Sequence, residues 1–128
     1  MKHYAVAELN ITEPSWIPAY VKHTTPLVEQ HGGRYLARTP HLEKIEGDRP
    51  PPQISLIIEW PSKEAAMAFY NSDAYKPHRE SRRKGSTGEF LLVAGEDING
   101  IAQMQATDAA ECRQSRVSER PAPRETIA

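Results

Sequence analysis

Seven side chains of this chain are of types that bind anions or move protons. Arginine favours carboxylates and other small anions because its planar guanidinium offers paired donors. Histidine exchanges protons near neutral pH, and a glutamate in a cleft does so once its pKa is raised. If they converge, the residues expected to hold the anion are Arg34, Tyr70, Tyr75 and Arg82, and the expected acids or bases are His23, Glu59 and His78.

These residues also fit an ordinary structural role. Glu59 would then form surface ion pairs with the arginines, and the tyrosines would pack in the core and form hydrogen bonds. Both interpretations depend on whether the side chains meet in one cleft, which is set by the elements that carry them.

The motifs of metal and cofactor chemistry are missing from the sequence. None of the five histidines pairs with another at a spacing of four residues, and there is no HExxH or CxxC motif. The chain also has no GxSxG, Walker or GxGxxG sequence. We therefore expect neither a bound metal nor a cofactor.

The charge balance argues against nucleic acid as a partner. The net charge is -1, and the basic run Lys76–Gly85 has no interleaved aromatic residues, so it is expected to be a solvated helix face. No apolar run approaches the length of a signal peptide core or a membrane span. With Cys112 as the single cysteine, no intramolecular disulfide can form, and a cytoplasmic protein is expected.

The first half of the chain predicts strand, helix and strand. The helix begins at Pro14 and ends at Gly32-Gly33, and Pro26 is expected to bend or interrupt it near Lys22. The second strand is expected to place Tyr35, Ala37 and Thr39 on one face and Arg34, Leu36 and Arg38 on the other. The predicted elements are strands at His3–Ile11 and Arg34–Thr39, then a loop over Pro40–Pro52 with a short strand extension at Leu42–Ile45.

The second half repeats this order around a strongly apolar strand, Gln53–Trp60. Its side chains are apolar on both faces, so both faces of the sheet should be covered, although the helices of so short a chain can cover only one. The predicted elements that follow are a helix capped by Ser62, a break at Asn71–Asp73, a helix over Ala74–Lys84 and a strand over Thr87–Ala94. The order β-α-β-β-α-β predicts the ferredoxin-like α+β fold, a four-stranded antiparallel sheet with its helices on one face.

Residues 1–96 therefore form one predicted domain, and residues 97–128 are expected to be a mobile or weakly helical tail because their apolar content falls. Within the domain, HGGRYLAR, IEGD, IIEWPSKEAAMAFYNSDAY, Arg82 and FLLVAG form a recognisable set. The chain from Tyr4 to about Gly95 resembles the uncharacterised family called domain of unknown function 1330, of the dimeric α+β-barrel superfamily. Trp60 stands where members often have phenylalanine, and the tail has no counterpart.

The resemblance implies a homodimer in which two sheets pack face to face across a two-fold axis, which would cover the second apolar face. Related dimeric barrels include isomerases and cofactor-independent monooxygenases. Two functions remain open. One is a cofactor-independent enzyme that acts by proton transfer on a small organic acid or lactone-like metabolite, and the other is a non-catalytic dimer that binds a small molecule or a protein partner.

Overall fold

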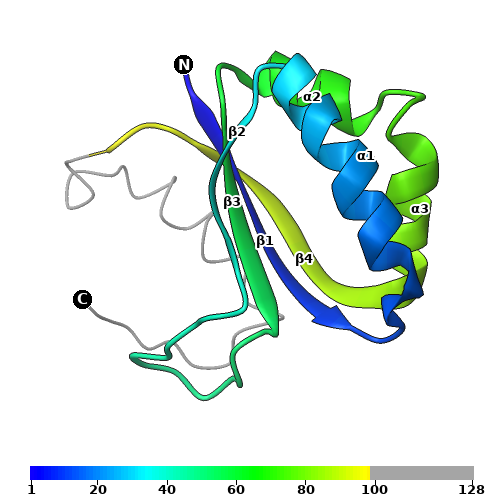
Figure 1. Cartoon of the computed structure of the whole chain (residues 1–128). Coiled ribbons are helices and arrows are strands. Elements are labelled where there is room, and N and C mark those ends of the chain that lie inside the picture. Colours follow the sequence, from blue (N-terminus) through cyan, green and yellow to red (C-terminus); the bar gives the residue numbers. More distant parts are fainter. Residues whose placement is uncertain (99–128) are drawn as a thin grey trace, which may run out of the picture. The chain divides into compact units, whose positions relative to one another are not determined.

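The computed structural model describes residues 1–98 of the chain. A four-stranded sheet carries all its helices on one face (Figure 1). The elements in chain order are β1 (His3–Ile11), the 3-10 turn η1 (Pro14–Trp16), α1 (Ile17–Gln30), β2 (Arg34–Thr39), β3 (Ile54–Trp60), α2 (Lys63–Tyr70), α3 (Lys76–Gly85) and β4 (Ser86–Ala94).

The strand order in the sheet is β2-β3-β1-β4, with antiparallel pairing throughout. The first strand lies beside the third and the fourth, so the two β-α-β halves interleave within one sheet. The predicted ferredoxin-like α+β fold is thereby confirmed. Among the residues that the structure describes, no helix has the length and apolar character needed to cross a membrane.

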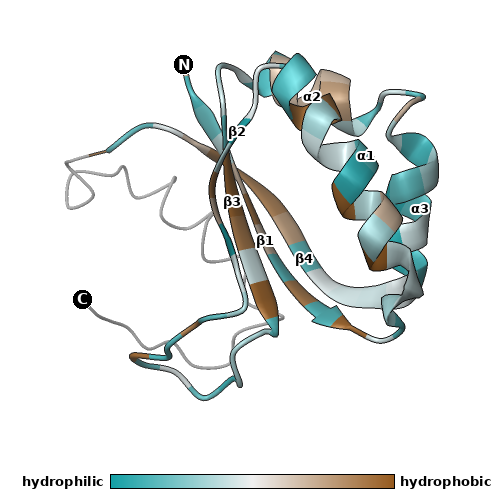
Figure 2. Cartoon of the chain, in the orientation of Figure 1, coloured by the Kyte–Doolittle hydropathy of each residue, from teal (hydrophilic) through white to brown (hydrophobic). Residues whose placement is uncertain are grey.

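The core lies between the sheet and the helices, and strand alternation determines which side chains enter it. On β1 and β3 every second residue is buried, and these residues pack against the apolar sides of the helices. Figure 2 shows hydrophobic residues along β1 and β3 and on parts of α1 and α2, whereas α3 is hydrophilic. The buried cluster is Ala5, Ala7, Val28, Leu56, Ile58, Trp60, Ala66, Phe69 and Tyr75.

Local sequence signals determine most helix boundaries, and these boundaries lie close to the predicted positions. Ser62 caps α2 by accepting a hydrogen bond of 3.0 Å from the backbone N–H of Ala65. The break after Tyr70 separates α2 from α3, and the Ser72 hydroxyl stabilises it by accepting from the Tyr75 N–H. Pro26 does not interrupt α1, since the helix continues to Gln30 and packs on the sheet through buried residues on either side of the proline.

Two sequence-based expectations about β2 and its loop are corrected. No strand forms at Leu42–Ile45, where the chain is irregular. The pairing of β2 with β3 shifts register between Tyr35 and Ala37, and beyond this bulge Arg38 lies opposite the core residue Leu56. Arg38 therefore joins Tyr35 on the helix side of the sheet, with its guanidinium 3.8 Å from the centre of the Tyr35 ring.

The sheet face that points away from the helices, here called the outer face, carries an apolar stripe. Val6 lies opposite both Ile57 and Leu91, and Tyr4 lies opposite Val93. Leu91 is 56% exposed and Val93 is 46% exposed. No helix within residues 1–98 covers this stripe. The predicted tail, residues 97–128, lies outside the described residues apart from its first two positions.

Candidate functional site

Among residues 1–98, Arg82 is the most deeply buried charged residue. It lies on α3 with only 6% of its surface exposed, and its guanidinium carbon is 5.2 Å from the centre of the Phe90 ring. Within residues 1–98 its side chain forms no ion pair with a carboxylate, and its Nε has no hydrogen-bond partner. A buried cation without a nearby carboxylate is energetically costly, so an anion bound beside it would stabilise it.

A pair of tyrosines from distant parts of the chain accompanies Arg82. The hydroxyls of Tyr20 on α1 and Tyr75 before α3 are 2.6 Å apart, and Tyr75 is fully buried. Burial, together with the adjacent Tyr75, raises the pKa of Tyr20 well above its ordinary value. Burial lowers the pKa of Arg82, but Tyr75 and Tyr20 outweigh it and raise that pKa overall. At neutral pH the cluster thus contains the Arg82 guanidinium cation and the neutral Tyr20 phenol.

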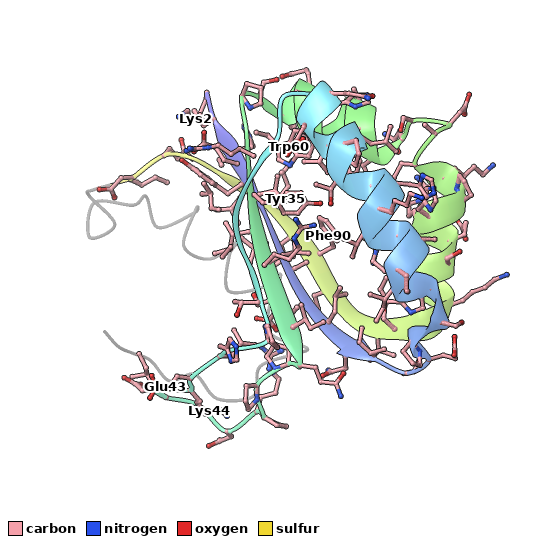
Figure 3. The ribbon with its side chains drawn as sticks, viewed as in Figure 1. Lys2, Tyr35, Glu43, Lys44, Trp60 and Phe90 are labelled. Atoms are coloured by element: carbon pink, nitrogen blue, oxygen red, sulfur yellow. The ribbon has the colours of Figure 1, made fainter. Side chains whose placement is uncertain are left out.

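A cavity of about 340 Å³ lies against Arg82. Phe90 on β4 points from the sheet toward the helices and contributes one wall (Figure 3). The lining is mostly polar and includes the start of β4; its residues are Leu9, Tyr70, Arg82, Arg83, Ser86, Thr87, Gly88 and Phe90. Because the cavity is bordered by a buried cation and by hydroxyl groups, it suits a small anion.

Tyr70 forms a second wall of this cavity, and Arg79 packs against Tyr70. The Arg79 guanidinium donates a hydrogen bond of 2.6 Å to the Tyr70 carbonyl oxygen and lies 5.1 Å from the centre of the Tyr70 ring. Of the residues expected to hold an anion, Tyr70, Tyr75 and Arg82 therefore come together. Arg79 and Phe90 also lie against the Tyr70 ring, and the sequence did not identify either as a candidate. Arg79 could have been found, because it precedes Arg82 by about one helical turn.

The two candidate histidines meet each other beside this site. The rings of His23 on α1 and His78 on α3 stack with centres 5.2 Å apart and planes at 19°. His23 is exposed and His78 is half-buried. Neither histidine lines the Arg82 cavity.

Arg34 and Glu59 lie on the outer face and do not converge with the Arg82 cluster. The Glu59 carboxylate is 3.2 Å from Lys2 and 3.4 Å from Arg34. The hydrogen bond from Lys2, helped by the charges of Lys2 and Arg34, lowers the pKa of Glu59. The sequence already indicated that Glu59 lies on the outer face. It stands between Ile58 and Trp60, and strand alternation places its side chain on the opposite face of the sheet from theirs.

The described residues offer no evident metal site. Within residues 1–98, no group of three or more histidine, cysteine, aspartate or glutamate side chains is placed to hold a metal ion. The chemistry that the cavity itself can supply is anion binding by Arg82 and hydrogen bonding or proton exchange by the Tyr70 phenol.

The fold and site define a ferredoxin-like α+β protein with a basic cavity beside its helices. The chain belongs to the family described as Domain of unknown function (DUF1330), whose model matches residues 2–96. No curated protein matches the chain.

Solved structures with the same fold are distant in sequence. RPA0582, a protein of unknown function from Rhodopseudomonas palustris, is 14% identical with a TM-score of 0.60 over 72% of this chain and 80% of its own. SnoaB, a cofactor-independent oxygenase from Streptomyces nogalater, is 17% identical with a TM-score of 0.55 over 74% of this chain and 93% of its own. At these identities the likeness concerns the fold alone.

Proposed function

We propose that this protein binds a small organic anion in the Arg82 cavity. The observation that supports this most directly is the burial of Arg82 beside a cavity, without a carboxylate partner among residues 1–98. A carboxylate placed there would form charge-assisted hydrogen bonds with the Arg82 guanidinium, whose Nε has no partner among residues 1–98. It would also remove the energetic cost of the uncompensated buried charge.

A thermal-shift screen of small carboxylates and phosphates tests this proposal. A ligand that binds only the folded state stabilises it by about 2.7 kcal/mol at about 100 times Kd, which corresponds to about 10 °C for a domain of this size. We expect at least one class of organic acid to raise the melting temperature, while the matched neutral amide does not. Equal responses to acid and amide would refute anion recognition by Arg82.

A second candidate is a cofactor-independent enzyme that acts on this anion by proton transfer. Two observations favour it: the hydrogen bond between the hydroxyls of Tyr20 and Tyr75, and the proximity of both phenols to Arg82, whose pKa they raise. The name of SnoaB, a cofactor-independent oxygenase with a related fold, is consistent with it. His23 and His78 stack on each other and do not line the cavity, so the proton carrier in contact with the anion would be the Tyr70 phenol.

Solvent-hydrogen exchange separates the enzyme from the binding protein. Incubation of a bound acid in D₂O, followed by NMR, reports whether its carbon-bound hydrogens exchange faster with protein than without it. Enzyme-dependent exchange supports proton transfer at carbon. Binding without exchange, for acids with activated hydrogens, supports a non-catalytic binding protein.

We also propose that two copies of the chain associate through the outer face. The apolar stripe of Val6, Ile57, Leu91 and Val93 crosses the centre of the sheet and is not covered by any helix within residues 1–98. Exposed contiguous apolar surface of this kind marks interfaces, and a symmetric sheet-to-sheet contact buries it on both copies at once. Lys2, Arg34 and Glu59 then form part of a polar rim.

Replacing Ile57 with glutamate is expected to convert the dimer into a monomer. The new carboxylate would stand in the middle of the stripe, where association would bury it without a partner. Sedimentation or light scattering measures the change in mass. Val21→Glu, on an exposed site of α1, is the matched control and should stay dimeric. An Ile57→Glu protein with unchanged mass would contradict this interface.

A further inference from the structure

The Arg82 cavity adjoins a second cavity of different chemistry. This apolar cavity measures about 260 Å³ and lies between α2 and the sheet, with Ala5, Ala66 and Leu92 among its lining residues. The two cavities have Tyr70 and Phe90 in common as walls. The two cavities therefore adjoin at these two rings, and a ligand that occupies both has to pass beside them.

Small side chains leave this apolar space open. Ala5 on β1 and Ala66 on α2 are buried at positions where a larger aliphatic residue would fill the cavity. Protein interiors contain few voids larger than one water molecule, and an apolar void offers water no hydrogen-bond partners. Met67 on α2 lines this cavity and is 38% exposed, so the space is accessible from solvent beside α2.

The rings between the two cavities have a defined geometry. Tyr70 and Phe90 meet edge to face, with ring centres 6.1 Å apart. Arg79 holds the Tyr70 backbone through its hydrogen bond to the carbonyl oxygen and contacts the Tyr70 ring. Aromatic walls of this kind favour a flat ring or an extended alkyl chain over a heavily hydroxylated body.

We propose that the ligand class of this protein is an amphiphilic monoanion: a carboxylate-like group at Arg82 joined to an aromatic or short aliphatic body in the apolar cavity. This specificity rests on the proposed anion-binding function and adds its second determinant. Arg82 fixes the charged end, and the space beside Ala66 selects the apolar end. Small polyanions and sugar acids lack the apolar body and are poor ligands.

A homologous series of straight-chain acids tests the proposal by calorimetry on the full chain. From acetate through butanoate to hexanoate, we expect affinity to rise by about fourfold for each methylene group buried, until the cavity is full. Phenylacetate is expected to bind more tightly than acetate. Hexanamide has the same alkyl chain as hexanoate but no charge, so it tests whether Arg82 contributes to affinity.

Ala66→Leu fills the apolar cavity and is expected to abolish the gain with chain length while leaving the weak binding of acetate unchanged. Ala68→Leu makes the same change on the exposed side of α2 and should behave as the wild type. If Ala66→Leu does not fold, Met67→Glu places a charge at the exposed rim and should lower hexanoate affinity more than acetate affinity.

The outcomes separate this inference from the function on which it rests. Acetate and hexanoate binding equally to the wild type would overturn the amphiphilic class and leave anion binding intact. Hexanamide binding as tightly as hexanoate would overturn the role of Arg82. Binding of no acid at all would overturn both. An unchanged chain-length gain in a folded Ala66→Leu protein would show that the apolar body does not enter this cavity.

Discussion

Arg82→Met is expected to make the ligand-free protein more stable and to abolish its response to organic acids. Methionine has a similar length and no charge, so it can occupy the same space against Phe90 without the cost of a buried guanidinium. In other proteins, replacing a buried ion pair with apolar residues is often neutral or raises the free energy of unfolding by about 1–4 kcal/mol. We expect Arg82→Met to raise the free energy of unfolding within this range. Urea denaturation measures the stability, and the thermal-shift screen measures the acid response.

Lys84→Met is the matched control for this experiment. It removes the same charge from the same helix at an exposed position that does not line either cavity. Its stability is expected to stay within about 0.5 kcal/mol of the wild type, with the acid response retained. If Arg82→Met proved strongly destabilised and still responded to acids, Arg82 would be a structural residue and the anion site would lie elsewhere.

Trp60→Ala is expected to lower the free energy of unfolding by about 3–5 kcal/mol. The Trp60 side chain is 1% exposed and stacks on Phe69 with ring centres 5.4 Å apart. It also packs so closely on Gly33 that a Cβ there would lie 2.9 Å from the indole. Since small domains have only about 5–15 kcal/mol of stability, this loss is large, and urea unfolding followed by circular dichroism measures it.

Trp60→Phe measures how much of this loss a smaller aromatic ring recovers. It keeps a ring against Phe69 and leaves a smaller void, so its cost should be clearly below that of Trp60→Ala. Equal costs for the two variants would show that the indole contributes through a contact that phenylalanine cannot replace. Trp16 remains in both variants as a fluorescence reporter at the other end of the helix layer.

The sequence placed the secondary structure well because its signals are local. Proline at a helix start, Ser62 as a cap and the alternating apolar residues of β1 and β3 each act over a few neighbouring residues. The errors in β2 have a non-local cause. The bulge that turns Arg38 toward Tyr35 depends on how β2 pairs with β3, which the alternation within β2 cannot reveal.

The candidate site likewise depends on both local sequence signals and non-local contacts. The residue types came from the sequence, but the seven candidates separate into three groups in space. Tyr70, Tyr75 and Arg82 lie together, His23 stacks on His78, and Arg34 pairs with Glu59 on the outer face. The contact of Tyr20 with Tyr75 joins positions 55 residues apart, which no local pattern encodes.

By itself the sequence determined the order of the elements, the ferredoxin-like α+β fold and the apolar character of both faces of β3. Those properties follow from periodicity and local conformational preference. Only the tertiary structure decided that Arg82 is buried without a carboxylate among residues 1–98 and that a polar and an apolar cavity meet at Tyr70 and Phe90. These features arise where α2, α3 and β4 pack, so they depend on distances between elements that are distant in sequence.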